Sequence, residues 1–381
     1  MQPFKRIVII AGEESGDLHA ASFVRELKTR HSTLDISGIG GRHMQDAGVH
    51  LISDLARYGV TGLSEVIRHL CVIRRAFNDI KAHLTANKPD VLILVDYPGF
   101  NLRLAKFAKQ VLGIRIIYYI SPQIWAWKAN RINTIRDCID HMAVILPFEK
   151  QLYERAGVPV SFVGHPLVNA VKTCDDIHVA RKQLGLPKDK RLVAMLPGSR
   201  THEIERLMPV LSETANKLYS QFNDIHFVIP VAGTIDPSVI KSYFAHNTIL
   251  PITFITGHAV ETVACSDCVV VASGTASLEC ALLLKPMCII YKASRLTYLA
   301  AFRLIKIKYL GLCNLLKNEM IAPELLQYDC NAHELTRVMI DLLNNEDVKQ
   351  RMITRLQQLK LSLSERSADC SMTSLIEREL W

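Results

Sequence analysis

Two series of short, β-branched apolar runs constrain what this chain can fold into. Most runs are nearly continuous in apolar residues and end in Gly, Asp, Ser or Pro, which is typical of parallel strands covered on both faces. Helix-length stretches separate them, and the alternation predicts two doubly wound α/β domains in tandem, each a Rossmann-like parallel sheet. The first series lies at 6–12, 36–41, 90–96, 114–121 and 142–147, and the second at 191–199, 225–231, 252–256, 268–274 and 287–291.

The length of 381 residues fits this organisation, because a typical domain has roughly 150 residues. We expect the boundary between residues 164 and 188, where a polar helix and a charged, Pro-containing connection follow GHPLVNAV. The predicted domains are residues 1–170 and residues 171–345. Residues 346–381 have helical spacing and no strand pattern, so we expect a helical C-terminal tail that could pack back on the first domain.

Charge and cysteine content narrow the classes of partner and compartment. The chain has 45 Lys and Arg against 37 Asp and Glu, and its net charge of +8 favours anionic partners: nucleic acid, acidic lipid or phosphorylated small molecules. Ten scattered Cys are typical of a reducing cytosol. Residues 1–16 lack a signal-peptide pattern, and no run is long and apolar enough for a spanning helix. Cys265 and Cys268 form a single CxxC pair, so we predict no metal site.

Candidate site residues follow the strands of the first domain. In open α/β sheets ligands bind beyond the carboxyl ends of the strands, and two such sheets facing each other enclose a central cleft. Asp96 leaves a buried strand in DYPGFN, where partial desolvation can raise the pKa of a carboxyl toward that of a general base. Helix capping, solvated acids or core packing are the structural alternatives for these motifs. The other candidates are Glu14, Ser15 and Asp17 in GEESGD, Asn101, Trp125 in SPQIWAWKANR, and His165 in GHPLV.

Two motifs of the second domain suit a diphosphate. LPGSRTHEIE follows a strong strand, so its turn can offer backbone N–H groups and the Arg200 side chain to a phosphate. SGTASLE places small residues at a helix start, and Glu279 one turn later can accept both hydroxyls of a ribose. An Arg200–Glu203 surface pair and an ordinary capped helix are the alternatives. The residues predicted to bind are Gly198, Ser199, Arg200, Glu203, Ser273, Gly274, Thr275 and Glu279.

Basic and apolar residues are interleaved in two segments. Residues 63–84 form an amphipathic helix that could lie on anionic lipid or simply bury its stripe in its own domain. Residues 280–318 hold no Asp or Glu but several Lys and Arg among apolar side chains. This pattern favours a lipid surface or a lipid-phosphate substrate over nucleic acid.

The ordered set GEESGD, GIGG, DYPGFN, SPQIWAWKANR, PFE, GHPLV, LPGSR with EIE, and SGTASLE resembles lipid-A-disaccharide synthase. The match extends from residue 7 to about residue 330. The resemblance implies a GT-B glycosyltransferase that moves 2,3-diacylglucosamine from its UDP derivative to the 6-hydroxyl of 2,3-diacylglucosamine 1-phosphate. It also implies inversion at the anomeric carbon without a metal or other cofactor. The expected location is cytoplasmic, peripheral on the inner membrane of a Gram-negative bacterium, and a homodimer is possible.

The resemblance assigns roles to the candidates. Asp96 would take the proton of the acceptor hydroxyl, Arg200 with the N–H groups of both turns would neutralise the departing UDP, and Glu279 would hold the uridine ribose. The remaining candidates of the first domain would serve the acceptor. A UDP-sugar 2-epimerase of the same architecture, or a basic nucleic-acid-binding protein, are the alternative functions.

Overall fold

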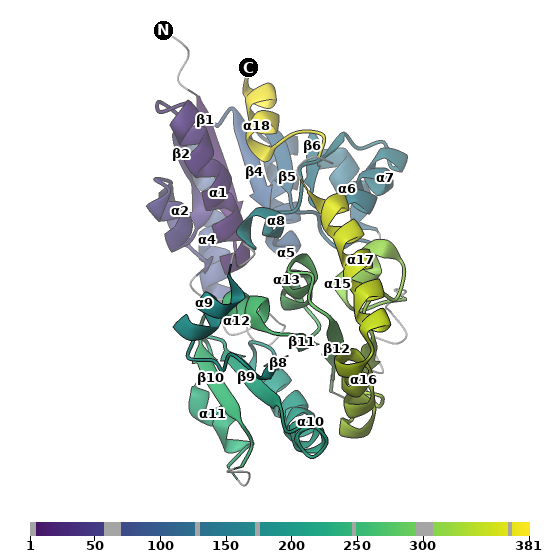
Figure 1. The fold of residues 1–381 in the computed structure, drawn as a ribbon. Coiled ribbons are helices and arrows are strands. Elements are labelled where there is room, and N and C mark those ends of the chain that lie inside the picture. The colour runs from purple at the N-terminus through teal and green to yellow at the C-terminus, as the bar shows by residue number, and fades with distance from the viewer. Residues whose placement is uncertain are drawn as a thin grey trace. The chain divides into compact units, whose positions relative to one another are not determined.

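The computed structural model describes residues 5–56, 70–125, 130–171, 176–245, 249–294, 308–364 and 368–381. The chain forms two compact units, each built on a parallel sheet (Figure 1). The first unit comprises Met1–Pro166 and Leu363–Trp381, and the second comprises Leu167–Ser362. Two Rossmann-like sheets are therefore confirmed.

The first unit has a seven-stranded sheet in the order β3-β2-β1-β4-β5-β6-β7. The edge strands β3 and β7 were not predicted, because they are short and polar residues interrupt their apolar pattern. The strands are β1 (Arg6–Ala11), β2 (Asp35–Gly40), β3 (His50–Asp54), β4 (Val91–Val95), β5 (Arg115–Tyr119), β6 (His141–Val144) and β7 (Val160–Phe162). The helices are α1 (Glu14–Arg30), α2 (Arg42–Asp46), α4 (Leu70–Ala86), α5 (Pro98–Gln110), α6 (Arg131–Cys138), α7 (Pro147–Arg155) and α18 (Met372–Leu380).

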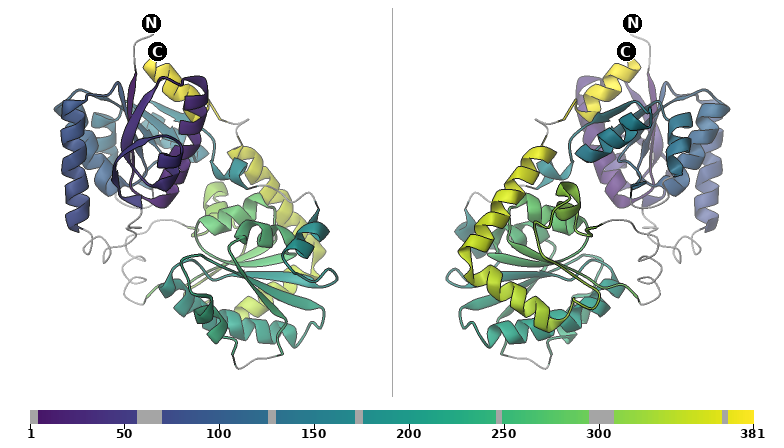
Figure 2. Two further views of the ribbon diagram at one scale, coloured as in Figure 1. Left: turned by 90° about the vertical axis from the view of Figure 1, so that its left-hand side faces the viewer. Right: turned by 90° about the vertical axis from the view of Figure 1, so that its right-hand side faces the viewer.

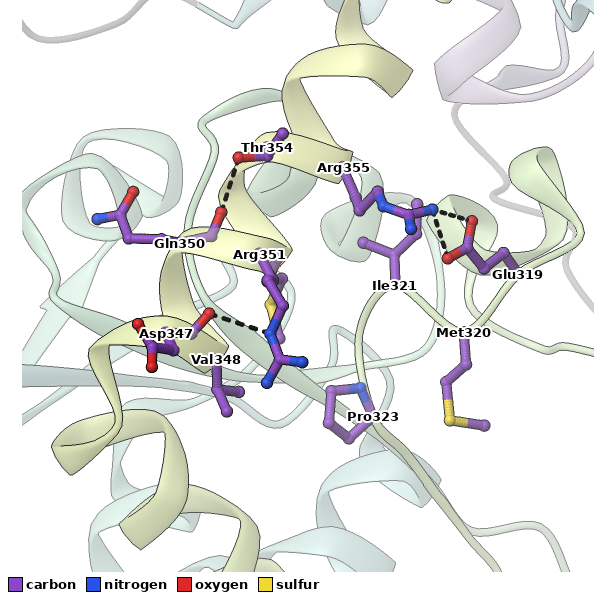
Figure 3. A pocket seen from close by; sticks show the side chains of 11 residues that line it. Glu319, Met320, Ile321, Pro323, Asp347, Val348, Gln350, Arg351, Thr354 and Arg355 are labelled. Carbon is purple, nitrogen blue, oxygen red and sulfur yellow. Dashed lines mark hydrogen bonds and ion pairs between the residues drawn. The ribbon is translucent and has the colours of Figure 1, made fainter.

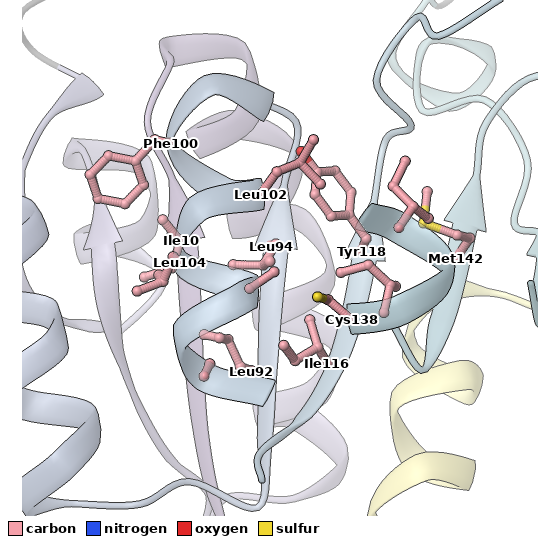
Figure 4. Packing of buried hydrophobic residues seen from close by; sticks show 14 of the residues in the cluster. Ile10, Leu92, Leu94, Phe100, Leu102, Leu104, Ile116, Tyr118, Cys138 and Met142 are labelled. Carbon is pink, nitrogen blue, oxygen red and sulfur yellow. The ribbon is translucent and has the colours of Figure 1, made fainter. Parts of the chain in front are cut away.

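Both faces of this sheet are buried, as the continuous apolar runs predict. Successive side chains of a strand point to opposite faces. Ile10 and Leu94 therefore join the core under α4, α5 and α6 (Figure 4), while Ile9 and Ile93 join a second core under α1 and α18. The predicted amphipathic helix is described from Leu70 onward, and residues 63–69 lie outside the described residues.

The second unit has a six-stranded sheet in the order β10-β9-β8-β11-β12-β13. Its strands are β8 (Arg191–Leu196), β9 (Ile225–Val231), β10 (Ile252–Thr256), β11 (Cys268–Ala272), β12 (Met287–Tyr291) and β13 (Glu324–Leu326). Its helices are α8 (Leu167–Ala170), α9 (Ile177–Gln183), α10 (Thr201–Tyr219), α11 (Pro237–Ser242), α12 (Ala259–Cys265), α13 (Thr275–Leu282), α15 (Leu312–Lys317), α16 (Ala332–Asn344) and α17 (Glu346–Leu363). α10 and α16 lie side by side against the sheet (Figure 2).

The last residues of the chain complete the first unit. α18 packs on α1, where Leu375 and Ile376 are fully buried, and the Asp369 carboxylate accepts the Phe162 N–H at 2.8 Å. The division between the units thus falls after Pro166 and again before Leu363, so residues 346–362 belong to the second unit rather than to a separate tail. No described helix is both long and apolar enough to cross a membrane.

Candidate active site

Two of the predicted motifs meet at the carboxyl edge of the first sheet. The strand order reverses between β1 and β4, and Ala11 pairs with Val95 at their carboxyl ends. GEESGD and DYPGFN therefore start from neighbouring strands at the switch point where open α/β sheets bind ligands. The two turns are in close contact, since a Cβ added at Gly12 would lie 2.2 Å from the Tyr97 ring.

Asp96 occupies a strained turn that its neighbours hold in place. Asp96 and Tyr97 both have a φ of 45°, a left-handed conformation that costs a non-glycine residue about 1–3 kcal/mol. The Asn101 side chain donates to the carbonyls of Val95 at 3.1 Å and Asp96 at 2.7 Å. The Tyr118 hydroxyl donates to the same Asp96 carbonyl at 2.6 Å. These bonds fix the direction in which the Asp96 carboxylate leaves the strand.

The Asp96 carboxyl has the electrostatics of a general base. Burial raises its pKa from 3.8 to about 6, although a hydrogen bond from the Tyr97 N–H acts in the opposite direction. A carboxyl with this pKa is mostly ionised at neutral pH and is more basic than an exposed one, which suits proton removal from a hydroxyl.

The acidic turn after β1 divides into two environments. Glu14 and Ser15 are exposed at the start of α1, where a ligand can reach them. Asp17 is only 1% exposed, and its carboxylate accepts the backbone N–H groups of Gly41 at 2.7 Å, His43 at 2.9 Å and Met44 at 3.1 Å. The Asp17 carboxylate thus caps the start of α2, and its expected part on the acceptor side stays a prediction.

Asn101 also differs from its expected role. Its side chain is fully buried beneath the Asp96 turn, so it positions the strained backbone and does not face a ligand. His165 is half-buried, and its backbone N–H donates to the Leu363 carbonyl at 3.3 Å. Burial, together with the charge of His19, lowers the pKa of His165 to about 4, so its imidazole is neutral at pH 7.

Trp125 leads to a residue that the sequence did not single out. The Trp125 indole N–H donates to Glu149 Oε1 at 3.1 Å, and Glu149 is 1% exposed. PFE stood among the ordered motifs, but nothing in the local pattern distinguishes a buried Glu from an exposed one in the first turn of a helix. Its indole partner lies 24 residues earlier in the chain.

The second unit repeats this arrangement. Its strand order reverses between β8 and β11, and Leu196 pairs with Val271, so LPGSR and SGTASLE meet at the switch point. A cavity of about 310 Å³ lies there. Almost every residue predicted to bind a diphosphate lines it, namely Gly198, Ser199, Arg200, Glu203, Ser273, Gly274 and Thr275.

Glu203 organises one wall of this cavity. Its carboxylate accepts the Ser199 N–H at 3.2 Å and lies 3.4 Å from Arg200 Nη1. Gly198 has a φ of 109°, which L side chains rarely adopt, and a Cβ there would also come within 2.3 Å of Glu203 Oε2. The Ser199 N–H that was expected to meet a phosphate is thus bonded to Glu203, and the Arg200–Glu203 pair suggested as the structural alternative is present.

The opposite wall is the start of α13. Its first backbone N–H groups have no partner inside the helix and point along a dipole that favours anions. The Ser273 N–H is used by the sheet, since it donates to Ile290 O at 2.9 Å. Glu279 is half-buried one turn along, and burial raises its pKa, but it does not line the cavity.

A larger cavity of about 910 Å³ lies elsewhere in the second unit (Figure 3). It is lined by α17 and by the segment before β13, and the Arg355–Glu319 ion pair closes one side at 2.5 Å. Pro323 precedes β13, so this cavity is at the amino edge of the sheet. Open parallel sheets bind ligands at the other edge, so the smaller cavity is the candidate site of the second unit.

A further cavity, of about 590 Å³, adjoins the Asp96 turn between α4 and α5. Its walls are mainly apolar side chains, among them those of Ile73, Phe77 and Phe100, and the guanidinium groups of Arg74 and Arg103 also line it. Tyr97 belongs to this lining, which places the cavity directly beside Asp96.

The family model of lipid-A-disaccharide synthetase matches residues 7–380. The chain belongs to the lipid-A-disaccharide synthase family. Lipid-A-disaccharide synthase 1 from Legionella pneumophila (strain Lens) is 60% identical over 375 residues, which cover 98% of this chain and 97% of that relative. The resemblance drawn from the ordered motifs is confirmed, and with it the glycosyltransferase class.

Solved structures place this lipid-A-disaccharide synthase family member within a widespread fold. The glycotransferase of kitacinnamycin aligns with a TM-score of 0.63 and 14% identity over 100% of both chains. A putative UDP-N-acetylglucosamine 2-epimerase from Listeria monocytogenes aligns with a TM-score of 0.62 and 14% identity, over 96% of this chain and 97% of that chain. Together with the two Rossmann-like sheets, these neighbours confirm the GT-B architecture.

Proposed function

We propose that this chain transfers 2,3-diacylglucosamine from its UDP derivative to the 6-hydroxyl of 2,3-diacylglucosamine 1-phosphate, giving the β-1,6-linked lipid A disaccharide 1-phosphate and UDP. Membership of the family supports the reaction. The observation that carries the mechanism is the half-buried Asp96 carboxyl, whose pKa is raised to about 6 and whose backbone is fixed by three side-chain hydrogen bonds to the carbonyls of Val95 and Asp96. It supplies the base that an inverting transfer requires.

In this mechanism the acceptor oxygen attacks the anomeric carbon of the donor sugar. The bond from that carbon to the UDP oxygen breaks, and its electron pair leaves with UDP. The acceptor hydroxyl gives its proton to Asp96. Arg200 and the N–H groups at the start of α13 stabilise the charge that develops on the diphosphate, because they line one cavity of suitable size. Glu203 holds Arg200 in place, and Glu279 binds the ribose.

The α4–α5 cavity fits the acceptor. An acylated sugar phosphate needs apolar walls and a cation, and this cavity offers aromatic side chains together with Arg74 and Arg103 beside the Asp96 turn. Leu70 at the start of α4 is 40% exposed. These features support a peripheral position on the cytoplasmic surface of the inner membrane, where acylated substrates reside. A homodimer stays a prediction.

The test is release of UDP by the purified protein, measured with both diacylglucosamine substrates and again without the acceptor. Transfer requires the acceptor, whereas an epimerase would interconvert the UDP-sugar alone. Asp96→Asn is expected to abolish transfer while UDP affinity stays within about twofold of the unmodified protein. Transfer retained by this variant would rule out Asp96 as the base.

A further inference from the structure

Glu149 is a buried carboxyl that the proposed mechanism does not use. It lies in the first turn of α7 and is 1% exposed, although Glu is almost never fully buried without a partner. Oε1 accepts the indole N–H of Trp125 at 3.1 Å. Oε2 is also buried, and no hydrogen bond of ordinary geometry reaches it from the residues that the structure describes.

The hydroxyl groups of Ser121 and Tyr153 are hydrogen-bonded to each other beside Glu149. Ser121 lies beside the carboxyl, and its Oγ is 2.9 Å from Pro122 O and 2.7 Å from the Tyr153 hydroxyl. Because a carbonyl can only accept, the Ser121 proton goes to Pro122, and Tyr153 donates to Ser121. The Ser121 oxygen keeps a second lone pair. A protonated Glu149 carboxyl can donate to that lone pair.

The electrostatic surroundings agree with a protonated carboxyl. Burial raises the pKa of Glu149 to about 8, and the negative charge of Asp96 adds to the rise, against hydrogen bonds that favour the anion. In the part of the chain that the structure describes, the titratable groups facing the cluster are Asp96 after β4, Tyr153 on α7 and Tyr118 on β5. Arg131 of α6 also acts on Tyr118.

Lys150, the next residue after Glu149, is engaged elsewhere. Its ammonium group is 2.7 Å from the carboxylate of Asp369, a residue of the C-terminal segment. Among the described residues, the charge that acts on Glu149 is the negative one of Asp96. Two carboxyls within each other's field do not both ionise easily, and the one in the less solvated environment keeps its proton.

We propose that Glu149 is a positioning residue that acts as an uncharged acid, fixing the Trp125 indole on one side and leaving Asp96 as the ionised member of the pair. This inference rests on the proposed function, in which Asp96 is the base. Ionisation of Glu149 at alkaline pH would place an unsatisfied anion in the protein interior beside Asp96. We therefore expect the rate of transfer to decline above about pH 8 because Glu149 ionises.

The kinetic experiment compares kcat and KM over about pH 5 to 10 for the unmodified protein, Glu149→Gln, Glu149→Asp and Trp125→Phe. Gln keeps the acceptor for the indole and replaces the acid O–H by an amide N–H. We expect its activity at pH 7 to stay within about threefold and its alkaline decline to disappear. Glu149→Asp moves the carboxyl away from the Trp125 indole, and Trp125→Phe removes the indole N–H. Each variant should therefore raise the KM for the acceptor about tenfold. Their double variant should be no worse than either, because both remove one interaction.

The opposite results are equally specific. Two results would overturn the proposal. A Glu149→Gln variant as inactive as Asp96→Asn would mean that the charged form of Glu149 is needed for transfer. An unchanged alkaline decline in Glu149→Gln would mean that ionisation of Glu149 does not cause the decline. Infrared difference spectra between about pH 7 and pH 10 provide a readout independent of transfer. A protonated-carboxyl C=O band that is present at pH 7 and missing in Glu149→Gln supports the proposal. If that band is present but no transfer occurs, the proposed function fails while the protonation state of Glu149 stands.

Discussion

Replacing Asp96 by Asn is expected to stabilise the first unit while it abolishes transfer. In the unfolded chain the carboxyl has its ordinary pKa of 3.8, and burial raises the value to about 6 in the folded protein. Since one pH unit corresponds to 1.36 kcal/mol, ionised Asp96 lowers the free energy of unfolding by up to about 3 kcal/mol. The side chain keeps partial solvent exposure, so we expect about 1–3 kcal/mol.

The pH dependence of this effect has a definite sign. The folded pKa lies above the unfolded one, so the destabilisation is complete above about pH 6 and disappears as the pH falls below 3.8. The Asn variant carries no such charge. Its stability advantage is therefore expected at pH 8 and should vanish near pH 4.

Tryptophan fluorescence can follow the unfolding of the first unit, because the tryptophans of the chain belong to that unit. The chain has three, Trp125, Trp127 and Trp381, and all belong to the first unit. Denaturant unfolding followed by tryptophan emission thus reports the unit that contains Asp96, without interference from the second unit. Asp79→Asn is the matched control, because this carboxylate is 48% exposed on α4. Equal stability of Asp96→Asn and the unmodified protein at pH 8, or an advantage that persists at pH 4, would refute the burial argument.

Three further predictions concern the two sites. Arg200→Ala should weaken UDP binding about tenfold or more in calorimetry, since a charged hydrogen bond contributes about 1.5–3 kcal/mol; unchanged affinity would remove Arg200 from the diphosphate site. Gly12→Ala should displace the Tyr97 ring and lower kcat more than tenfold, and an unchanged kcat would show that the ring position does not matter for transfer. Because the pKa of His165 is lowered to about 4, its NMR signals should not titrate between about pH 5 and 8, and its burial should reduce stability as the pH falls from 6.5 toward 4.

The sequence was sufficient to bring distant motifs to common sites. Apolar runs predicted the strands, and parallel strands necessarily place their carboxyl ends at one edge, where the turn after each strand carries the chemistry. The cavity formed by LPGSR and SGTASLE in the second unit is the clearest outcome. Two of the unpredicted strands, β3 and β7, are edge strands with polar residues, whose stability depends on a neighbouring strand rather than on their own pattern.

Side-chain direction was beyond the local sequence. Glu14 and Asp17 stand three residues apart in one acidic turn, yet one is exposed and the other is buried against backbone N–H groups more than twenty residues later. Asn101 was expected to serve the acceptor, and Glu149 was not singled out. Both are buried because their hydrogen-bond partners come from other strands and loops. Such contacts become visible only when the sheet order is known, and one sequence does not determine that order.

The return of the chain to the first unit has a consequence for biosynthesis. Met372, Leu375, Ile376 and Leu380 belong to the same core as the strands of the first sheet, and the Trp381 ring stacks on His31 at 4.5 Å. All residues of the second unit, up to Ser362, are made before the last segment of the first unit. The unit that holds Asp96 lacks part of its core until residues 363–381 have been made. Changes in residues 372–380 therefore act on the core of the unit that holds Asp96, although they lie next to the second unit in the sequence.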